Sequence, residues 1–563
     1  MKKIESLSVI SIFTFVFVIS FITSVEKIVT FSSLIFLIIL LIFYKDLNKN
    51  ISNSLQKFIE NFSKFPTFIL LIILFIVLII GQNRYLDYEI ITWDVASYLV
   101  ASSEISSGNI PLETQWESKG PLLMYIYFFL DWIVNGDYVK FRILNDLVLF
   151  STSLMIYLIV YKETEGEKIK SFIGSLLFIV TTSIVWYVSE FSEIYCLLFL
   201  SISIYVYNNF QNKALSNFII GLLVSISSLI NLASALFILP FLVSNIYKFG
   251  FIGSLKTNIQ KSLGFFMPHL FFLIIYYQKS LLDVYIANLI TIPLGYNSEQ
   301  SLSSIYELRV WSREIYNFNI FLYFAILTLI ICFLVKNLKN LKHIFSNVYV
   351  LSLVLSVVIY FIGGHNYYHH LFYLVFFIPF LLTGVHNKKY IILIYIFIFS
   401  SGFITVKDSF DQSSKNLLSI NELLVNYPLY EIAQEIESNY QDDYTIFALD
   451  YLMVLNYLDK TNYSYIVHPM NHFSNFITDT LIDLEKIEDN NIIKLINERP
   501  DVFICNTSLI INGIPEKLEV DFLCDIKVLG NDYYQLDTTK YEGNRKLNFY
   551  FDPYRELKVF IKK

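Results

Sequence analysis

Long apolar runs separated by short polar connections dominate the first 409 residues of this 563-residue chain. Roughly twenty consecutive apolar residues form a helix that crosses the ~30 Å hydrocarbon core of a bilayer. Runs close to this length recur along the chain, and they predict thirteen membrane-spanning helices. The predicted spans are 7–23, 29–43, 66–82, 141–161, 171–188, 194–208, 215–231, 233–248, 261–277, 318–335, 347–363, 370–386 and 390–405.

The basic residues of the connections predict how these spans are oriented. Lys and Arg collect in the cytoplasmic loops of membrane proteins, and here they concentrate in connections such as 45–64, 162–170, 248–261 and 336–342. With the N-terminus inside, alternation of the spans places every basic connection on the cytoplasmic side. The same alternation predicts that residues 410–563 lie on the outer, extracytoplasmic side of a plasma membrane.

Two further apolar stretches do not fit as spans. Residues 121–136 are short and contain Asp131, and residues 281–316 are amphipathic and contain Asp283. Segments of this kind lie along a membrane interface rather than across it. We therefore predict that both lie at the outer surface. Functional polar residues are to be sought there, because polar side chains that face lipid are costly.

From about Phe410 onwards, charged residues become frequent and the apolar runs shorten. Strand-like segments alternate with helical patterns, as in a small α/β domain. The predicted fold is a mostly α polytopic membrane protein (residues 1–409) with a C-terminal extracytoplasmic α/β domain (residues 410–563). The predicted elements of this domain are strands at 444–449, 463–467 and 501–505 and helices at 416–438 and 477–498.

The composition agrees with a membrane protein and excludes one class of function. Hydrophobic residues make up 55% of the chain and charged residues 16%, whereas charged residues are about a quarter of a soluble domain. The net charge of -7 offers no basic surface for nucleic acid. Cys505 and Cys524 lie in the C-terminal region, where an extracytoplasmic location would permit a disulfide. We favour two unrelated thiols, because two cysteines alone make no disulfide framework.

Acidic and aromatic residues cluster in the first predicted outer loop, residues 83–140. Three carboxylates, Asp87, Glu89 and Asp94, come before a short helical pattern that ends at Gly108. Asp94 directly precedes that helix, so its simplest role is an N-cap that accepts a backbone N–H. A catalytic role is the alternative, and the two are compatible because a cap also holds the carboxylate in place.

This loop resembles the first outer loop of the GT-C glycosyltransferases of the protein O-mannosyltransferase and aminoarabinose transferase type. That family shows an acidic residue, a Tyr, a helix punctuated by Ala and Gly, then Lys-Pro or Lys-Gly-Pro, and an Arg at the start of the next span. The matching residues here are Asp94, Tyr98, Ala101, Gly108, Lys119-Gly120-Pro121 and Arg142, with weaker similarity at Ser192-Glu193 and 365–370. Many members have two adjacent acidic residues, but Val95 follows Asp94 here, so a second carboxylate is unassigned.

The resemblance implies an enzyme that transfers a hexosyl or pentosyl group from a polyprenyl-phosphate carrier to a glycan, lipid or protein acceptor. Asp94 would be the general base that takes a proton from the acceptor. The leaving phosphate would need cations. The candidates are Lys119, Arg142, Arg309 and Arg313, whose simpler interpretation is snorkelling at helix ends. The other residues expected to bind substrate are Tyr98, Glu89, Glu193, His365 and Tyr368.

The histidines near residue 365 raise the question of a metal. His365 and His369 are four residues apart, so on a helix both would lie on one face. The preferred interpretation is a belt of aromatic and polar residues at the membrane interface. The pattern therefore requires no metal or other cofactor, and it leaves a divalent metal ion open.

Two other classes of function fit a polytopic membrane protein. A transporter or flippase of lipid-linked glycans usually shows internal repeats with matching broken spans, and no such pairing is visible. A polysaccharide polymerase or ligase usually has its basic residues in a long loop late in the chain. Here the acidic and aromatic cluster lies in the first large loop. The sequence identifies neither the sugar, the acceptor, the lipid nor the oligomeric state.

Overall fold

The computed structural model describes most of the chain. The described residues are 60–62, 64–89, 92–183, 190–210, 213–296, 312–313, 315–317, 319–337, 346–362, 368–385, 388–440, 443–489, 491–506, 524–525, 530–541 and 557–563. The predicted spans 7–23 and 29–43 lie outside these residues. So do two of the predicted site residues, Arg309 and His365.

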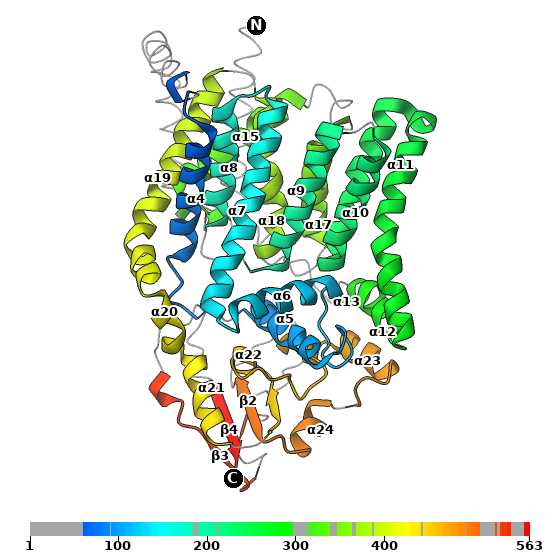
Figure 1. The fold of residues 1–563 in the computed structure, drawn as a ribbon, viewed down its shortest axis with the longest axis vertical. Helices are drawn as coiled ribbons and strands as arrows, with labels where there is room; N and C mark the ends of the chain where they lie inside the picture. Colours follow the sequence, from blue (N-terminus) through cyan, green and yellow to red (C-terminus); the bar gives the residue numbers. More distant parts are fainter. Residues whose placement is uncertain are drawn as a thin grey trace.

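One layer of the molecule consists of long apolar helices that run side by side in Figure 1. Every predicted span from 66–82 onwards overlaps a helical segment of this layer. Residues 368–384 are less regular than predicted, because a short α-helix lies between two 3-10 helices. The layer comprises α4 (Thr67–Asn83), α7 (Tyr138–Glu163), α8 (Lys168–Thr182), α9 (Ser192–Phe210), α10 (Ala214–Ile230), η2 (Leu232–Phe237), α11 (Ile238–Gln278), α15 (Ile320–Asn337), α17 (Val348–Ile362), η5 (Tyr368–Leu371), α18 (Phe372–Phe377), η6 (Ile378–Gly384) and α19 (Lys388–Leu418).

The predicted spans 233–248 and 261–277 join into one long element, α11, with a sharp reversal inside it. Gly250 has φ +73° and ψ 168° there, a backbone conformation that is accessible mainly to glycine. Asn258 Nδ2 donates to the carbonyl of Leu242 at 3.3 Å, so the two arms of α11 lie side by side. The basic connection predicted at 248–261 is therefore largely helical.

Three helical segments of the described chain are long and apolar enough to cross a membrane: Tyr138–Glu163, Leu232–Gln278 and Tyr390–Leu418. The other apolar helices are shorter. Large apolar side chains are exposed along the outside of the layer, for example Phe68 on α4 and Ile252 on α11. Monomeric soluble proteins rarely expose continuous apolar surfaces of this kind, and these features indicate an integral membrane protein.

Short helices form a second layer across one end of the long helices (Figure 1). Both stretches that we predicted as interfacial contribute to it, although residues 297–311 lie outside the described chain. Pro121 begins α6 at the first helical turn, where its missing N–H costs nothing. The layer comprises α5 (Trp93–Ser103), η1 (Glu104–Ser107), α6 (Pro121–Val134), α12 (Leu282–Ile286), η3 (Ala287–Thr291) and α13 (Ile292–Tyr296).

The C-terminal region forms a third layer with a four-stranded sheet of order β1-β2-β4-β3. Strands β1 and β2 pair in parallel, and β4 is antiparallel to both β2 and β3. The helix α19 runs through the predicted domain boundary at residue 409 and ends at Leu418. The elements are α20 (Ile420–Leu423), η7 (Leu424–Asn426), α21 (Pro428–Ser438), β1 (Ile446–Ala448), α22 (Met453–Tyr457), η8 (Pro469–Phe473), α23 (Asn475–Asp483), α24 (Asn491–Asn497), β2 (Val502–Asn506), β3 (Tyr533–Gln535), η9 (Thr539–Tyr541) and β4 (Leu557–Lys562).

The predictions for this region are only partly correct. Strands β1 and β2 match two predicted strands, whereas β3 and β4 were not predicted. The third predicted strand, 463–467, does not join the sheet. Instead, Ile466 forms an isolated parallel bridge with Trp116, which lies in the segment 83–140 that keeps the name first outer loop after its predicted location. The apolar alternation of this segment therefore reflects packing between two parts of the chain rather than pairing within the sheet.

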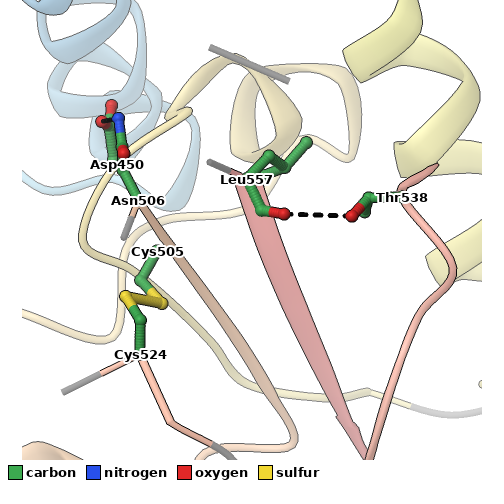
Figure 2. Close-up of a disulfide and its surroundings, with 6 residues drawn as sticks. All are labelled: Asp450, Cys505, Asn506, Cys524, Thr538 and Leu557. Atoms are coloured by element: carbon green, nitrogen blue, oxygen red, sulfur yellow. Dashed lines mark hydrogen bonds between the residues drawn. A yellow bond between two sulfur atoms is a disulfide. The ribbon is translucent and has the colours of Figure 1, made fainter. Parts of the chain in front are cut away.

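The interpretation of Cys505 and Cys524 as unrelated thiols is wrong. The two form a disulfide with Cα atoms 6.0 Å apart, drawn in Figure 2. Cys505 lies on β2, next to Asn506. The amide of Asn506 donates to Asp450 Oδ2 at 3.0 Å. The folding of the C-terminal region, rather than a cysteine pattern in the sequence, brings the two thiols together.

Candidate functional site

The first turn of α5 holds Asp94, but Asp94 is not the N-cap. Helix α5 begins at Trp93, and the cap is Thr92, whose Oγ1 accepts from the backbone N–H of Val95 at 3.3 Å. Asp94 lies within the first turn, and the Tyr98 hydroxyl donates to its Oδ1 at 3.0 Å. The capping role predicted for Asp94 therefore belongs to Thr92, and the Asp94 carboxylate is available for other contacts.

Asp94 is ionised and partly open to solvent. Its side chain is 26% exposed. Burial alone would raise the pKa of Asp94, but the charges of His369, His468 and Lys119 and the hydrogen bond from Tyr98 outweigh it and lower that pKa to about 2. A carboxylate in this environment carries its charge throughout the physiological pH range, and it lies near a lysine and two imidazoles from separate parts of the chain.

Backbone hydrogen bonds hold the segment that carries Lys119 in place. The N–H of Gly120 donates to the carbonyl of Ile230, at the end of α10, at 3.1 Å. A Cβ on Gly120 would lie 2.0 Å from the carbonyl oxygen of Leu229, so only glycine permits this approach. Asn288 Nδ2 donates to the Lys119 carbonyl at 3.1 Å. The Lys-Gly-Pro motif thus anchors the lysine between α6, α10 and the π-helical turn η3.

The Lys119 ammonium faces three carboxylates without forming a close ion pair. Burial lowers the pKa of Lys119, but the charges of Glu193, Asp94 and Glu117 outweigh this effect and raise that pKa. Among the described residues, no carboxylate oxygen lies within the 4.0 Å ion-pair distance of its Nζ. This arrangement leaves the ammonium able to bind an additional anion.

Glu193 lies in the first turn of α9 and is 1% exposed. Its Oε1 accepts from Asn231 Nδ2 at 2.8 Å, and its Oε2 accepts from the hydroxyl of Ser192 at 3.1 Å. Its side chain approaches His369 and His370 of η5. The ligand atoms of these three residues lie within 4.8 Å of one another, so this trio is the described group best placed to hold a metal ion.

The C-terminal region contributes a residue that the sequence analysis missed. His468 Nε2 lies 3.9 Å from Asp94 Oδ1, and the His468 side chain is 13% exposed. His468 Nδ1 accepts from the backbone N–H of Met470 at 3.2 Å, so in the neutral ring Nε2 bears the proton. No local motif marks His468 in the sequence.

Contacts between the first outer loop and the C-terminal region hold His468 in place. The N–H of Trp116 donates to the Tyr465 carbonyl at 2.6 Å, and the N–H of Val467 donates to the Trp116 carbonyl at 3.2 Å. Beside Asp94, the Trp93 indole donates to Asp450 Oδ1 at 2.9 Å. The C-terminal region is therefore part of the site rather than a separate appendage.

The comparisons with known proteins identify the fold. No family model matches this sequence, and no curated protein matches it. The structure is similar to ArnT from Cupriavidus metallidurans bound to undecaprenyl phosphate, with a TM-score of 0.55 at 10% identity over 88% of this chain and 98% of ArnT. The chain has the GT-C fold. This finding confirms the fold that the first outer loop indicated.

A more distant GT-C protein also matches. This protein is the oligosaccharyltransferase AglB from Archaeoglobus fulgidus, in complex with an inhibitory peptide and a dolichol-phosphate. The match covers 80% of this chain and 70% of the AglB chain. The identity is 12% and the TM-score is 0.42.

Two residues predicted to bind substrate connect separate parts of the fold. Arg142, 6% exposed, forms an ion pair through Nε with Glu190 at 3.1 Å. It also donates to the carbonyls of Tyr88 and Tyr85 at 2.9 and 3.2 Å and to the Tyr427 hydroxyl at 3.4 Å. Protein groups engage every nitrogen of the guanidinium, so Arg142 holds separate parts of the fold together, and its contact with phosphate stays a prediction.

Glu89 likewise stabilises a connection between layers. Its side chain is fully buried. Its Oε2 accepts from the N–H of Leu429 in the first turn of α21 at 2.9 Å, and its Oε1 accepts from the Tyr457 hydroxyl at 2.8 Å. A carboxylate at a helix N-terminus accepts a hydrogen bond from a free N–H and interacts favourably with the positive end of the helix dipole. Glu89 therefore attaches α21 to the first outer loop.

The remaining predicted residues contribute less to the described site. Tyr98 binds Asp94 and thereby helps to orient it. Arg313 lies on the surface. Tyr368 begins η5, directly before the two histidines. The described site thus consists of Asp94, Tyr98, Lys119, Glu193, His369, His370 and His468.

Proposed function

We propose that this protein is an integral membrane glycosyltransferase that transfers a sugar from a polyprenyl-phosphate carrier to an acceptor on the outer face of the membrane. The observation that carries the proposal is an ionised, partly open Asp94 beside the anchored Lys119, whose ammonium has no close ion-pair partner among the described residues. The GT-C fold supports it, as does the undecaprenyl phosphate bound to the similar protein ArnT.

The two side chains suit the two halves of the reaction. The acceptor hydroxyl or amine attacks the anomeric carbon of the sugar, and the bond between that carbon and the phosphate oxygen breaks. Asp94 takes the proton that the acceptor loses. The polyprenyl phosphate leaves as an anion, and Lys119 stabilises its growing negative charge. A carboxylate with a pKa of about 2 is a weak base, so the proton moves late, once the acceptor atom has become acidic.

The proposed topology has thirteen spans with the C-terminal domain outside. The disulfide between Cys505 and Cys524 supports an extracytoplasmic location, because disulfides persist in oxidising compartments and are rare in the cytosol. A reporter fused at Lys563 should report the extracytoplasmic side. A cytoplasmic signal would contradict this topology.

The enzymatic proposal is tested with purified protein and a panel of polyprenyl-phosphate sugars labelled in the sugar. The expected result is transfer of label to an acceptor together with release of the polyprenyl phosphate. Asp94→Asn should lower both in parallel, by roughly 10²–10⁴-fold. If the protein moves labelled lipid across a vesicle membrane without breaking the bond to phosphate, it is a flippase and the proposal is wrong.

A further inference from the structure

Three side chains from two separate helical elements converge on one point of the candidate site. Glu193 comes from α9, and His369 and His370 come from η5. One carboxylate oxygen and one nitrogen of each imidazole all lie within 4.8 Å of one another. Ligand atoms around a single bound ion are roughly 3–4 Å apart for metal–ligand bonds of about 2.0–2.2 Å. Small side-chain rotations would therefore bring all three onto one ion.

The surroundings of these side chains restrict their motion, as expected around a metal site. Asn231 holds Glu193 Oε1 through its Nδ2 at 2.8 Å, while its own Oδ1 accepts from the N–H of Ala233 at 3.1 Å. The His369 ring stacks on Phe191 with centroids 4.6 Å apart and an interplanar angle of 16°. Outer contacts of this kind orient metal ligands and raise affinity.

We propose that Glu193, His369 and His370 bind one divalent ion of the Zn²⁺ class. Two imidazoles and one carboxylate suit Zn²⁺ and related transition metals better than Mg²⁺ or Ca²⁺, which prefer oxygen ligands. Three protein ligands also leave at least one coordination position open, as in sites where the ion contacts substrate. The alternative to a metal site is a cluster of buried polar side chains that form hydrogen bonds with one another.

The location of the cluster indicates what the open position would contact. Asn231, which holds Glu193, directly follows Ile230, whose carbonyl accepts from the N–H of Gly120, the residue after Lys119. The ion would therefore lie near the Lys119 segment, where an oxygen of the carrier phosphate could reach it. The contact between the ion and the carrier phosphate rests on the proposed function, whereas the binding of the ion does not.

The binding test uses the full-length protein in detergent, stripped with a chelator and dialysed against micromolar Zn²⁺. Elemental analysis should find one Zn²⁺ per chain. Glu193→Gln, His369→Ala and His370→Ala should each lower the affinity at least tenfold. His269→Ala is the matched control, because His269 lies on α11, bonds to Ser228 at 2.8 Å and should leave the stoichiometry at one.

A second measurement separates loss of the site from loss of folding. Co²⁺ at a three-ligand site with two imidazoles gives visible absorption bands that do not require activity or lipid. The stripped wild type should develop these bands and a higher melting temperature. The three variants should melt at the temperature of the stripped wild type and show neither effect. Absence of Zn²⁺ from the wild type, or unchanged affinity in all three variants, would overturn the proposal whether or not the protein transfers sugar.

Discussion

His468 Nε2 lies 3.9 Å from Asp94 Oδ1, although the two residues belong to the C-terminal and first outer regions of the chain. This separation is too long for a direct hydrogen bond. A single acceptor oxygen or nitrogen at about 2.8–3.0 Å from each atom would bond to both. Because His468 Nε2 carries the proton in the neutral ring, it would donate to that atom while Asp94 receives a proton from it. In the proposed reaction, the pair would therefore define a position for the acceptor.

Replacing Asp94 by Asn should lower turnover by roughly 10²–10⁴-fold, as expected for loss of a general base. The protein should still fold, because Thr92 rather than Asp94 caps α5. Turnover at saturating donor and the melting temperature are the measurements. The matched control is Asp87→Asn, because Asp87 binds Gln412 and Asn416 of α19 and should affect turnover much less. Near-normal transfer by Asp94→Asn would remove Asp94 from the mechanism.

Lys119→Ala should raise the KM for the lipid donor by roughly 10–100-fold. This factor corresponds to the loss of one charge-assisted hydrogen bond to phosphate. The KM for the acceptor should change little. Lys279→Ala provides the control, since Lys279 is an exposed lysine that pairs with Glu113 at 3.3 Å. Unchanged donor dependence in a well-folded Lys119→Ala protein would show that another group binds the phosphate.

His468→Ala should raise the KM for the acceptor about tenfold, the cost of one lost hydrogen bond to a bound substrate. The KM for the donor should be unchanged. His468→Gln should restore part of the affinity, because its amide can donate where Nε2 does. If donor and acceptor constants change together, or if Gln and Ala behave alike, His468 only supports the fold and does not contact the acceptor.

Arg142→Ala should destabilise the protein by about 3–5 kcal/mol, because it leaves the Glu190 carboxylate buried without its partner. Thermal unfolding in detergent measures this loss. Lys140→Ala removes an exposed partner of Asp137 on the same helix and should cost no more than about 1 kcal/mol. A stable Arg142→Ala enzyme with a raised donor KM would instead show that Arg142 binds phosphate.

The pH profile of kcat/KM should show no acid limb from Asp94 above about pH 4. The pKa of Asp94 in the folded protein, about 2, lies below the ordinary aspartate pKa of 3.8. Ionised Asp94 therefore stabilises the folded protein fully above pH 3.8, and this contribution disappears as the pH falls through 2. Profiles of the wild type and Asp94→Asn measured between pH 4 and 8 provide the test. A limb near pH 6 that is present only in the wild type would contradict this assignment.

Local sequence was sufficient for much of the helical layer and for part of the site. The length of an apolar run is a property of consecutive residues, so 66–82 and 215–231 were correctly predicted as helices. The run 121–136 was recognised as different because it is short and contains Asp131. The first outer loop indicated the GT-C fold because Asp94, Tyr98 and Lys119-Gly120-Pro121 lie within one short segment.

Tertiary structure decided the features that depend on contacts between distant segments. His468 has no sequence signal, and it reaches Asp94 only because Ile466 pairs with Trp116. Arg142 matched the motif, but only the structure shows its ion pair with Glu190 and its hydrogen bonds to nearby carbonyls. Cys505 and Cys524 are 19 residues apart in the sequence, and only the folded chain shows that they are bonded. Hydrophobic periodicity reports which side of an element is buried, but it does not report which other element covers that side.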